Sequence, residues 1–252
     1  LHKSPDLRHS SHTSGGGSLK AIILSAGQGR RLLPYTQDLP KCLLPVDGDI
    51  PVLGVQLRAL REGGVTEVRV MVGFQAEKVE AFLESHRVLG LDVETIYNPF
   101  FDSTDNLVTA WLARSEMASD FLLLNGDTIF EPAVLRQLIS APYAPITLVV
   151  NGKPRYDEDD MKVSLGEDGR IRAISKSLLL DRTDGESIGL MRFRGEGVAA
   201  FRSTATRVTF GAICLSNSSH LVPRLYSYRR KPVVLPPGRA RLSMRPPPTG
   251  ST

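Results

Sequence analysis

Between residues 19 and 150, five short apolar runs alternate with four stretches whose apolar residues recur at helical spacing. The first run, residues 19–25, reads as a strand buried on both faces of a parallel sheet. Strands that alternate with helices at this interval indicate βαβ units, with helices on both faces of the sheet. The expected strands are 19–25, 67–72, 91–97, 121–124 and 145–150, and the expected helices are 51–62, 76–86, 106–117 and 132–139.

The pattern changes after residue 151. Residues 161–165 and 170–175 alternate in polarity around a segment bounded by Gly166 and Gly169, which predicts an antiparallel hairpin. A further short strand is expected at 187–194. The predicted fold class is therefore α/β: a doubly wound, mainly parallel sheet with a small antiparallel insertion.

Three segments are expected along the chain. Residues 1–18 are polar and rich in glycine and serine, which predicts a flexible leader, and residues 19–201 hold the α/β pattern. Residues 202–252 are dense in proline and arginine and predict a disordered basic tail. Because no acidic residue follows Glu196, an alternative hypothesis is that translation leaves the reading frame of the domain near Phe201.

Charge and cysteine content exclude several functional classes. The net charge of +4 arises in the last 56 residues, which hold nine Lys or Arg and no acid, so nucleic-acid binding is not inferred for the domain. No apolar run reaches the roughly 18 residues that a membrane span requires. Cys42 and Cys214 make no disulfide framework, which favours a reducing, cytoplasmic location.

A glycine-rich loop follows the first expected strand. Gly27 and Gly29 let the backbone approach a ligand and turn its N–H groups toward an anion. The loop departs from the dinucleotide-binding pattern, because Leu32 stands where a third glycine would open a helix. It also lacks the Gly-Lys-Ser/Thr of a Walker loop. A dinucleotide-binding oxidoreductase is therefore disfavoured.

The loop places eight residues over fifteen positions: Gly27, Gly29, Arg31, Leu32, Pro34, Thr36, Pro40 and Lys41. This pattern resembles the signature loop of nucleotidyltransferases that make activated sugars and alcohols, and implies their Rossmann-like fold. The resemblance implies that Arg31 grips the β- and γ-phosphates of a nucleoside triphosphate and that Lys41 stabilises charge at the α-phosphate. The alternative is that Arg31 and Lys41 are ordinary solvated charges of the loop. The implied nucleotide-binding set is Leu24, Ala26, Gly27, Gly29, Arg31 and Asn106.

A second motif, Asn125-Gly126-Asp127, follows the apolar run at 121–124. A carboxylate at the end of a buried strand can hold Mg²⁺ against phosphate oxygens. The aspartate at this place in the resembled family is a metal ligand, which implies a catalytic, Mg²⁺-binding role for Asp127. Taken alone, an aspartate after a strand is more often a turn or a helix cap.

Residues 98–107, with the pair Asp105-Asn106, and the strands after residue 160 resemble the alcohol-phosphate branch of this family. That branch includes choline-phosphate, inositol-phosphate and aminoethylphosphonate cytidylyltransferases. The resemblance implies CTP as the donor and a phosphorylated alcohol such as phosphocholine as the acceptor. The implied acceptor-binding residues are Lys162, Lys176 and Glu186. Their alternatives are ordinary exposed strand lysines and a glutamate that caps a turn.

Four aromatic residues could shelter a quaternary ammonium group by cation–π contact, although such side chains more often belong to a core. They are Tyr97, Phe100, Phe101 and Trp111.

The predicted reaction is an in-line attack of the acceptor phosphate on the α-phosphorus, with release of pyrophosphate. No Ser-His-Asp or Cys-His arrangement points to a covalent intermediate. The resembled enzymes usually bring a second metal-binding carboxylate from a late strand, and Asp102 or Asp105 would have to replace it here. The alternatives are a sugar-1-phosphate nucleotidyltransferase and a catalytically impaired, nucleotide-binding remnant. The sequence leaves open whether the chain forms a homodimer.

Overall fold

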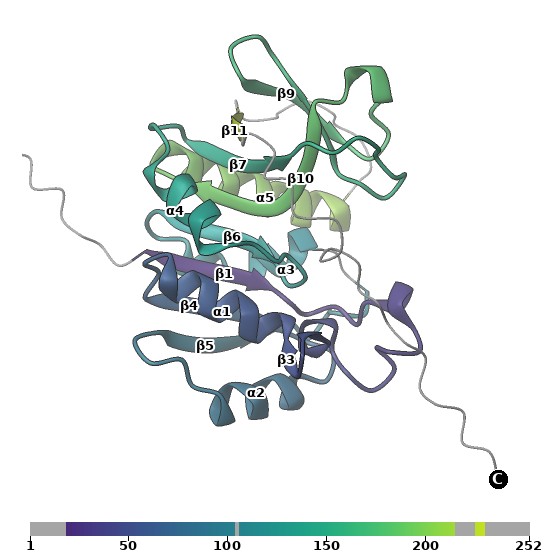
Figure 1. Cartoon of the computed structure of the whole chain (residues 1–252), viewed down its shortest axis with the longest axis vertical. Helices are drawn as coiled ribbons and strands as arrows, with labels where there is room; N and C mark the ends of the chain where they lie inside the picture. The colour runs from purple at the N-terminus through teal and green to yellow at the C-terminus, as the bar shows by residue number, and fades with distance from the viewer. Residues whose placement is uncertain (1–18, 104–105, 215–224, 230–252) are drawn as a thin grey trace, which may run out of the picture.

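The computed structural model describes residues 19–103, 106–214 and 225–229, and places helices on both sides of a central sheet (Figure 1). The leader expected at 1–18 lies outside the described residues. The strands are β1 (Lys20–Leu24), β2 (Pro45–Asp47), β3 (Ile50–Pro51), β4 (Glu67–Val72), β5 (Asp92–Tyr97), β6 (Phe121–Asn125), β7 (Ile146–Asn151), β8 (Lys162–Leu165), β9 (Arg170–Ser175), β10 (Gly185–Phe193) and β11 (Leu225–Arg229). The α-helices are α1 (Val52–Glu62), α2 (Ala76–Ser85), α3 (Asn106–Leu112), α4 (Pro132–Ser140) and α5 (Glu196–Cys214), with short 3-10 helices η1 (Arg30–Leu32), η2 (Lys41–Leu43), η3 (Arg114–Glu116) and η4 (Leu180–Arg182).

The central sheet has nine strands in the order β5-β4-β1-β6-β10-β7-β11-β9-β8. The first four strands in this order run parallel to one another, and β10 runs antiparallel between β6 and β7. The hairpin expected after residue 160 is present as the antiparallel pair β8–β9. The sheet confirms the predicted doubly wound, mainly parallel architecture with an antiparallel insertion.

The register of the strands decides which loops meet. Leu24, the last residue of β1, lies opposite Met71 of β4 and Asn125 of β6. Because these strands are parallel, the loops that follow β1 and β6 leave the sheet at the same edge. Strand β10 runs the other way, with Leu190 opposite Leu124, so its first residues reach this edge too. We call this the carboxyl edge of the sheet.

Two apolar cores join the sheet to its helices. On one face α1, α2 and α4 pack against the strands, and both Leu57 and Leu135 are at most 1% exposed. On the other face Phe121 stacks on Phe193 with 4.7 Å between ring centroids, and Phe201 of α5 packs against both rings. Burial of large apolar side chains on both faces is the main term that stabilises such a layered fold.

Helix α5 was not expected from the sequence. The domain boundary expected at residue 201 falls inside this helix, and residues 202–214 continue it. Val198, Phe201 and Ala205 recur at helical spacing and face the core, so this helix forms without acidic residues in its later turns. Residues 225–229 add β11, parallel to β7. The rest of the expected tail, 215–224 and 230–252, lies outside the described residues.

Short elements were also missed by periodicity. The small antiparallel sheet of β2 and β3 has strands of three and two residues, too short to show a period of two. Within the described part of the chain, no helix is both long and apolar enough to span a bilayer.

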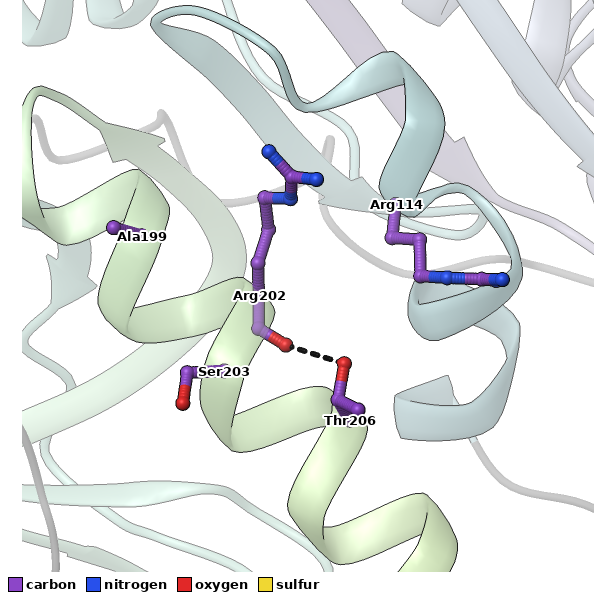
Figure 2. A pocket seen from close by; sticks show the side chains of 5 residues that line it. All are labelled: Arg114, Ala199, Arg202, Ser203 and Thr206. Carbon is purple, nitrogen blue, oxygen red and sulfur yellow. Dashed lines mark hydrogen bonds between the residues drawn. The ribbon is translucent and has the colours of Figure 1, made fainter.

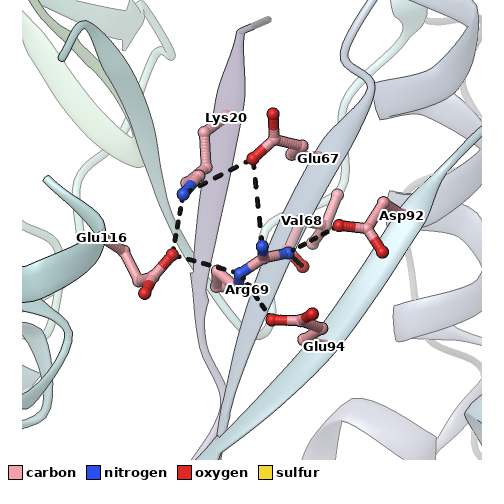
Figure 3. A network of polar contacts seen from close by, with 7 residues as sticks. All are labelled: Lys20, Glu67, Val68, Arg69, Asp92, Glu94 and Glu116. Carbon is pink, nitrogen blue, oxygen red and sulfur yellow. Dashed lines mark hydrogen bonds and ion pairs between the residues drawn. The ribbon is translucent and has the colours of Figure 1, made fainter. Parts of the chain in front are cut away.

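Figure 3 shows a network of ion pairs around Arg69. Lys20, Glu67 and Asp92 of this network are the first residues of β1, β4 and β5, so it lies at the end of the sheet opposite the carboxyl edge. Arg69 of β4 is 8% exposed, and its guanidinium lies 3.2 Å from carboxylate oxygens of Asp92, Glu94 and Glu116. Lys20 Nζ lies 2.7 Å from Glu116 as well. The hydrogen bond from Lys20 holds the pKa of Glu116 below its usual value. The network therefore ties the amino ends of three strands to η3.

We expect Glu116→Gln to lower the free energy of unfolding by about 1 kcal/mol at pH 7. The pKa of Glu116 is lower in the folded chain than in the unfolded chain, where it lies near 4.5. Its contribution is therefore present above pH 4.5 and is lost as the pH falls through the folded value. Urea unfolding at a series of pH values checks this. Glu84→Gln, on the exposed surface of α2, is the control; a difference that does not shrink in acid would contradict the assignment.

Candidate active site

The glycine loop after β1 is closed by its own side chains. Thr36 is fully buried, and its Oγ1 donates to the carbonyl oxygen of Gly29 at 3.0 Å. Gln28 Nε2 donates in turn to the carbonyl oxygen of Thr36 at 3.3 Å. Gly29 adopts a left-handed conformation with φ of 75°, and a Cβ there would lie 3.0 Å from Cβ of Lys41. The loop therefore folds back so that its two ends meet at the alkyl stem of Lys41.

The turn after β6 brings Asp127 to the same place. Gly126 N–H donates to the carbonyl oxygen of Leu24 at 2.8 Å, and a Cβ on Gly126 would lie 2.3 Å from Oγ of Ser25. This close approach requires glycine between Asn125 and Asp127. In the structure the ammonium group of Lys41 forms an ion pair with the carboxylate of Asp127. Two residues predicted from separate motifs thus meet at the carboxyl edge.

Arg31 lies on the exposed side of the same loop. Its guanidinium lies 2.6 Å from Asp159, which follows β7, and Lys176 Nζ lies 3.4 Å from the other oxygen of that carboxylate. The hydrogen bond from Arg31 holds the pKa of Asp159 below its usual value. Asp159 therefore joins a predicted phosphate-binding residue of the loop to a predicted acceptor-binding residue of the antiparallel half.

The start of α3 also reaches the site. Asn106 Nδ2 donates to Oδ1 of Asn125 at 3.4 Å, so this predicted nucleotide-binding residue lies beside the turn that carries Asp127. The segment before α3 is anchored by Asn98, which is fully buried and whose Nδ2 donates to Oγ1 of Thr109 at 3.0 Å. Of the predicted backbone contributors, Leu24 and Ala26 are buried and Gly27 is exposed.

The predicted acceptor residues differ in accessibility. Lys162 is 4% exposed, and its Nζ donates to the carbonyl oxygens of Asp157 at 2.7 Å and Lys176 at 2.9 Å. Its ammonium group is thus engaged with backbone. Glu186 lies 2.8 Å from Nζ of Lys153, which also lies 2.6 Å from Asp160. The carboxylates of Glu186 and Asp160 and the ammonium group of Lys153 together carry a net negative charge.

Asp102 and Asp105 are the two acids considered as a second metal ligand. Asp102 forms an ion pair with Arg30 of the glycine loop. Asp105 lies outside the described residues. Among the residues that the structure describes, no three His, Cys, Asp or Glu side chains gather as a metal cluster.

A separate groove of about 580 Å³ lies between α5 and the segment around η3 (Figure 2). The guanidinium groups of its two arginines, Arg114 and Arg202, point in different directions and do not converge on one ligand. Arg114 stacks 4.0 Å from the ring centroid of Trp111, one of the aromatic residues considered for cation binding. Two others, Tyr97 and Phe100, are more than half exposed. The groove is not part of the carboxyl edge.

Residues 21–233 match the model of the MobA-like NTP transferase domain. The chain belongs to this family. It is similar to a Streptomyces rubellomurinus protein named CMP-5'-(3-aminopropyl)phosphonate synthase, with 35% identity over 159 residues that make up 60% of this chain and 25% of the relative. It is also similar to the Bifunctional IPC transferase and DIPP synthase of Aquifex aeolicus, with 30% identity over 67% of this chain and 37% of the relative. The choline-phosphate cytidylyltransferase of Streptococcus pneumoniae is 27% identical over 50% of this chain and 52% of its own length.

Solved structures show the same fold. The inositol-1-phosphate CTP transferase from T. maritima aligns with a TM-score of 0.63 and 20% identity over 84% of this chain and 86% of its own. The CTP:phosphocholine cytidylyltransferase of Streptococcus pneumoniae aligns with a TM-score of 0.56 and 20% identity, covering 77% and 79%. The chain spans between a quarter and about half of the lengths of the three curated relatives.

Sequence reasoning missed two polar residues that shape the site. Asp159 stands in the run Asp157-Glu158-Asp159-Asp160, where no spacing distinguishes one acid from another. Gln56 lies on the buried face of α1, and its position between Leu53 and Leu57 was a signal, because an uncharged amide inside an apolar helix face needs partners.

Gly29→Ala is expected to lower the free energy of unfolding by about 1–2 kcal/mol, because alanine resists the left-handed conformation and would crowd Lys41. Gly27→Ala is the matched control, since a Cβ there meets nothing within 4 Å. Chemical denaturation of both variants without nucleotide checks this prediction. Equal stability of the two would show that the loop is not held in this conformation.

Proposed function

We propose that this chain transfers a nucleotidyl group from CTP to a small phosphorylated alcohol and releases pyrophosphate. The observation that carries the proposal is the contact between Lys41 and Asp127, which unites the glycine loop and the turn after β6 at the carboxyl edge. Ligands of doubly wound sheets bind at this edge. The relatives named as cytidylyltransferases support CTP as the donor.

The glycine loop supplies the groups for a triphosphate. A Cβ on Gly27 would meet nothing within 4 Å, so phosphate oxygens can approach the backbone there. Leu24, Ala26 and Gly29 would contribute backbone contacts beside it. Arg31 binds the β- and γ-phosphates through its planar, multiply donating guanidinium. Its exposed pairing with Asp159 is weak enough to exchange for a phosphate. Asn106 would contribute amide contacts from the start of α3.

Asp127 would hold Mg²⁺. Its half-exposed carboxylate is one oxygen donor group, and Mg²⁺ in nucleotide enzymes is bound by one or two carboxylates together with substrate phosphates. The donor set of the described site fits that pattern, without a second protein carboxylate. When bound, the ion would neutralise charge on the triphosphate.

Lys41 is placed to act on the same phosphate. Its ammonium group would stabilise the negative charge that builds on the α-phosphate as the acceptor oxygen attacks and pyrophosphate leaves. The acceptor phosphate is already anionic, so positioning and charge neutralisation carry the reaction and no general base is required.

The acceptor would lie toward the antiparallel half. Lys176 is exposed and can exchange Asp159 for the acceptor phosphate. Glu186, with Asp160 beside it, favours an acceptor whose far end is cationic or rich in hydroxyl groups. Lys162 would contribute indirectly, because its ammonium group holds the backbone of residues 157 and 176 beside the proposed acceptor site.

The substrates are tested by pyrophosphate release from CTP, dTTP and GTP, each offered with phosphocholine, an aminoalkylphosphonate, inositol 1-phosphate and glucose 1-phosphate. Release with CTP and an alcohol phosphate or phosphonate is the expected result. Release with glucose 1-phosphate would favour the sugar-phosphate alternative. Thermal stabilisation by CTP and Mg²⁺ without pyrophosphate would favour an impaired, nucleotide-binding protein.

Lys41→Ala and Asp127→Ala are each expected to lower kcat by at least about 100-fold, because each removes a charge that acts on the reacting phosphates. Their melting temperatures should stay close to that of the unaltered protein, since an ion pair this exposed contributes little to stability. Arg58→Ala, which removes an exposed positive charge from α1, is the control for net charge. Unchanged turnover in either site variant would refute the assignment.

A further inference from the structure

Gln56 is a buried amide that the proposed reaction does not use directly. It is 1% exposed, and its Nε2 donates to the carbonyl oxygens of Asn125 at 2.9 Å and Thr128 at 2.8 Å. Both hydrogens of the amide nitrogen are thus engaged with backbone of the loop after β6. Helix α1 is thereby connected to this loop by a side chain that lies 69 residues away from Asn125 in sequence.

The two carbonyl groups belong to the first and last residues of the turn that presents Asp127. Thr128 N–H donates to the carbonyl oxygen of Asn125 at 3.2 Å, which closes a β-turn with Asp127 at its third position. Gln56 bridges the two ends of this turn from α1. A shift of the turn toward or away from Lys41 would therefore break at least one of its hydrogen bonds.

Two further hydrogen bonds each hold a single residue of the turn. Gly126 N–H donates to the carbonyl oxygen of Leu24 on β1, and Thr128 Oγ1 donates to the carbonyl oxygen of Ile188 on β10 at 2.6 Å. Together with Gln56, these contacts hold the turn from three elements. Gln56 is the side chain among them that spans it.

Packing alone does not account for an amide at this position. Gln56 Oε1 is buried and accepts no hydrogen bond from the described residues, a defect that an apolar side chain would avoid. The orientation of the amide follows from its partners, because a reversed amide would set an oxygen against two carbonyl oxygens. The value of glutamine here lies in its two donors.

We propose that Gln56 is a positioning residue that sets where the carboxylate of Asp127 stands relative to Lys41 and to the metal–triphosphate group. The proposal rests on the proposed function. Residues that orient a metal ligand act on metal affinity and on the chemical step, whereas the acceptor is bound in the other half of the protein.

The test is Gln56→Met, which keeps the length of the side chain and removes both donors. We expect kcat to fall about tenfold or more and the Mg²⁺ concentration for half-maximal activity to rise about tenfold. The KM for the acceptor should change less than about twofold, since the acceptor residues are untouched. The melting temperature should also fall, because two backbone carbonyl oxygens lose a buried donor.

Leu60→Val is the matched control. Leu60 lies one turn further along the same buried face of α1, and its apolar side chain makes no hydrogen bond to the turn, so this substitution perturbs packing alone. A lower melting temperature with an unaltered Mg²⁺ dependence is expected for it. If Gln56→Met and Leu60→Val change kcat and Mg²⁺ dependence to the same extent, Gln56 is merely structural and the proposal is overturned.

Hydrogen exchange separates this proposal from the proposed function. In Gln56→Met the amide of Thr128, which closes the turn, should exchange about tenfold faster than in the unaltered protein, with or without nucleotide. If the unaltered protein releases no pyrophosphate with any nucleotide but this amide is loosened, the proposed function fails and the bracing of the turn stands. Unchanged exchange together with unchanged kcat overturns the positioning role.

Discussion

The parallel pairing of β1 with β6 is the constraint on which the rest of this site depends. It sets Leu24 opposite Asn125, so that the glycine loop and the turn carrying Asp127 leave the sheet side by side. A shift of one residue in this pairing would exchange the side chains of β6 between the two apolar cores, which are packed for the present arrangement, and would move Asp127 along the sheet. The burial that stabilises the sheet therefore also determines the geometry of the site.

Charges at the carboxyl edge are paired within the protein. Lys41 pairs with Asp127, Arg30 with Asp102, and Arg31 with Asp159. These side chains are between about one third and three quarters exposed, so the pairs contribute little to stability and can be exchanged for phosphate groups at small cost. The ion pairs of Arg69 at the other end of the sheet differ, because that guanidinium is nearly buried and would be left without solvent if its partners were removed.

The antiparallel half extends the sheet beyond the parallel strands. Strand β10 enters between β6 and β7 and brings both Glu186 and Ile188 to the carboxyl edge, where Ile188 supports the turn through Thr128. Helix α5, which follows β10, covers the face on which Phe121 and Phe193 stack. The segment expected to be a tail thus begins as part of the core.

The sequence by itself determined the kinds of elements and the chemistry available to the site. Uninterrupted apolar runs identify buried strands, because this signal depends only on near neighbours in the sequence. The spacing from Gly27 to Lys41 and the aspartate after the run at 121–124 led to the proposed phosphate site. The tertiary structure alone decided which side chains meet: Lys41 with Asp127, 86 residues apart, Arg31 with Asp159, and Gln56 with the turn at 125–128. Such contacts depend on strand order and register, which local periodicity does not encode.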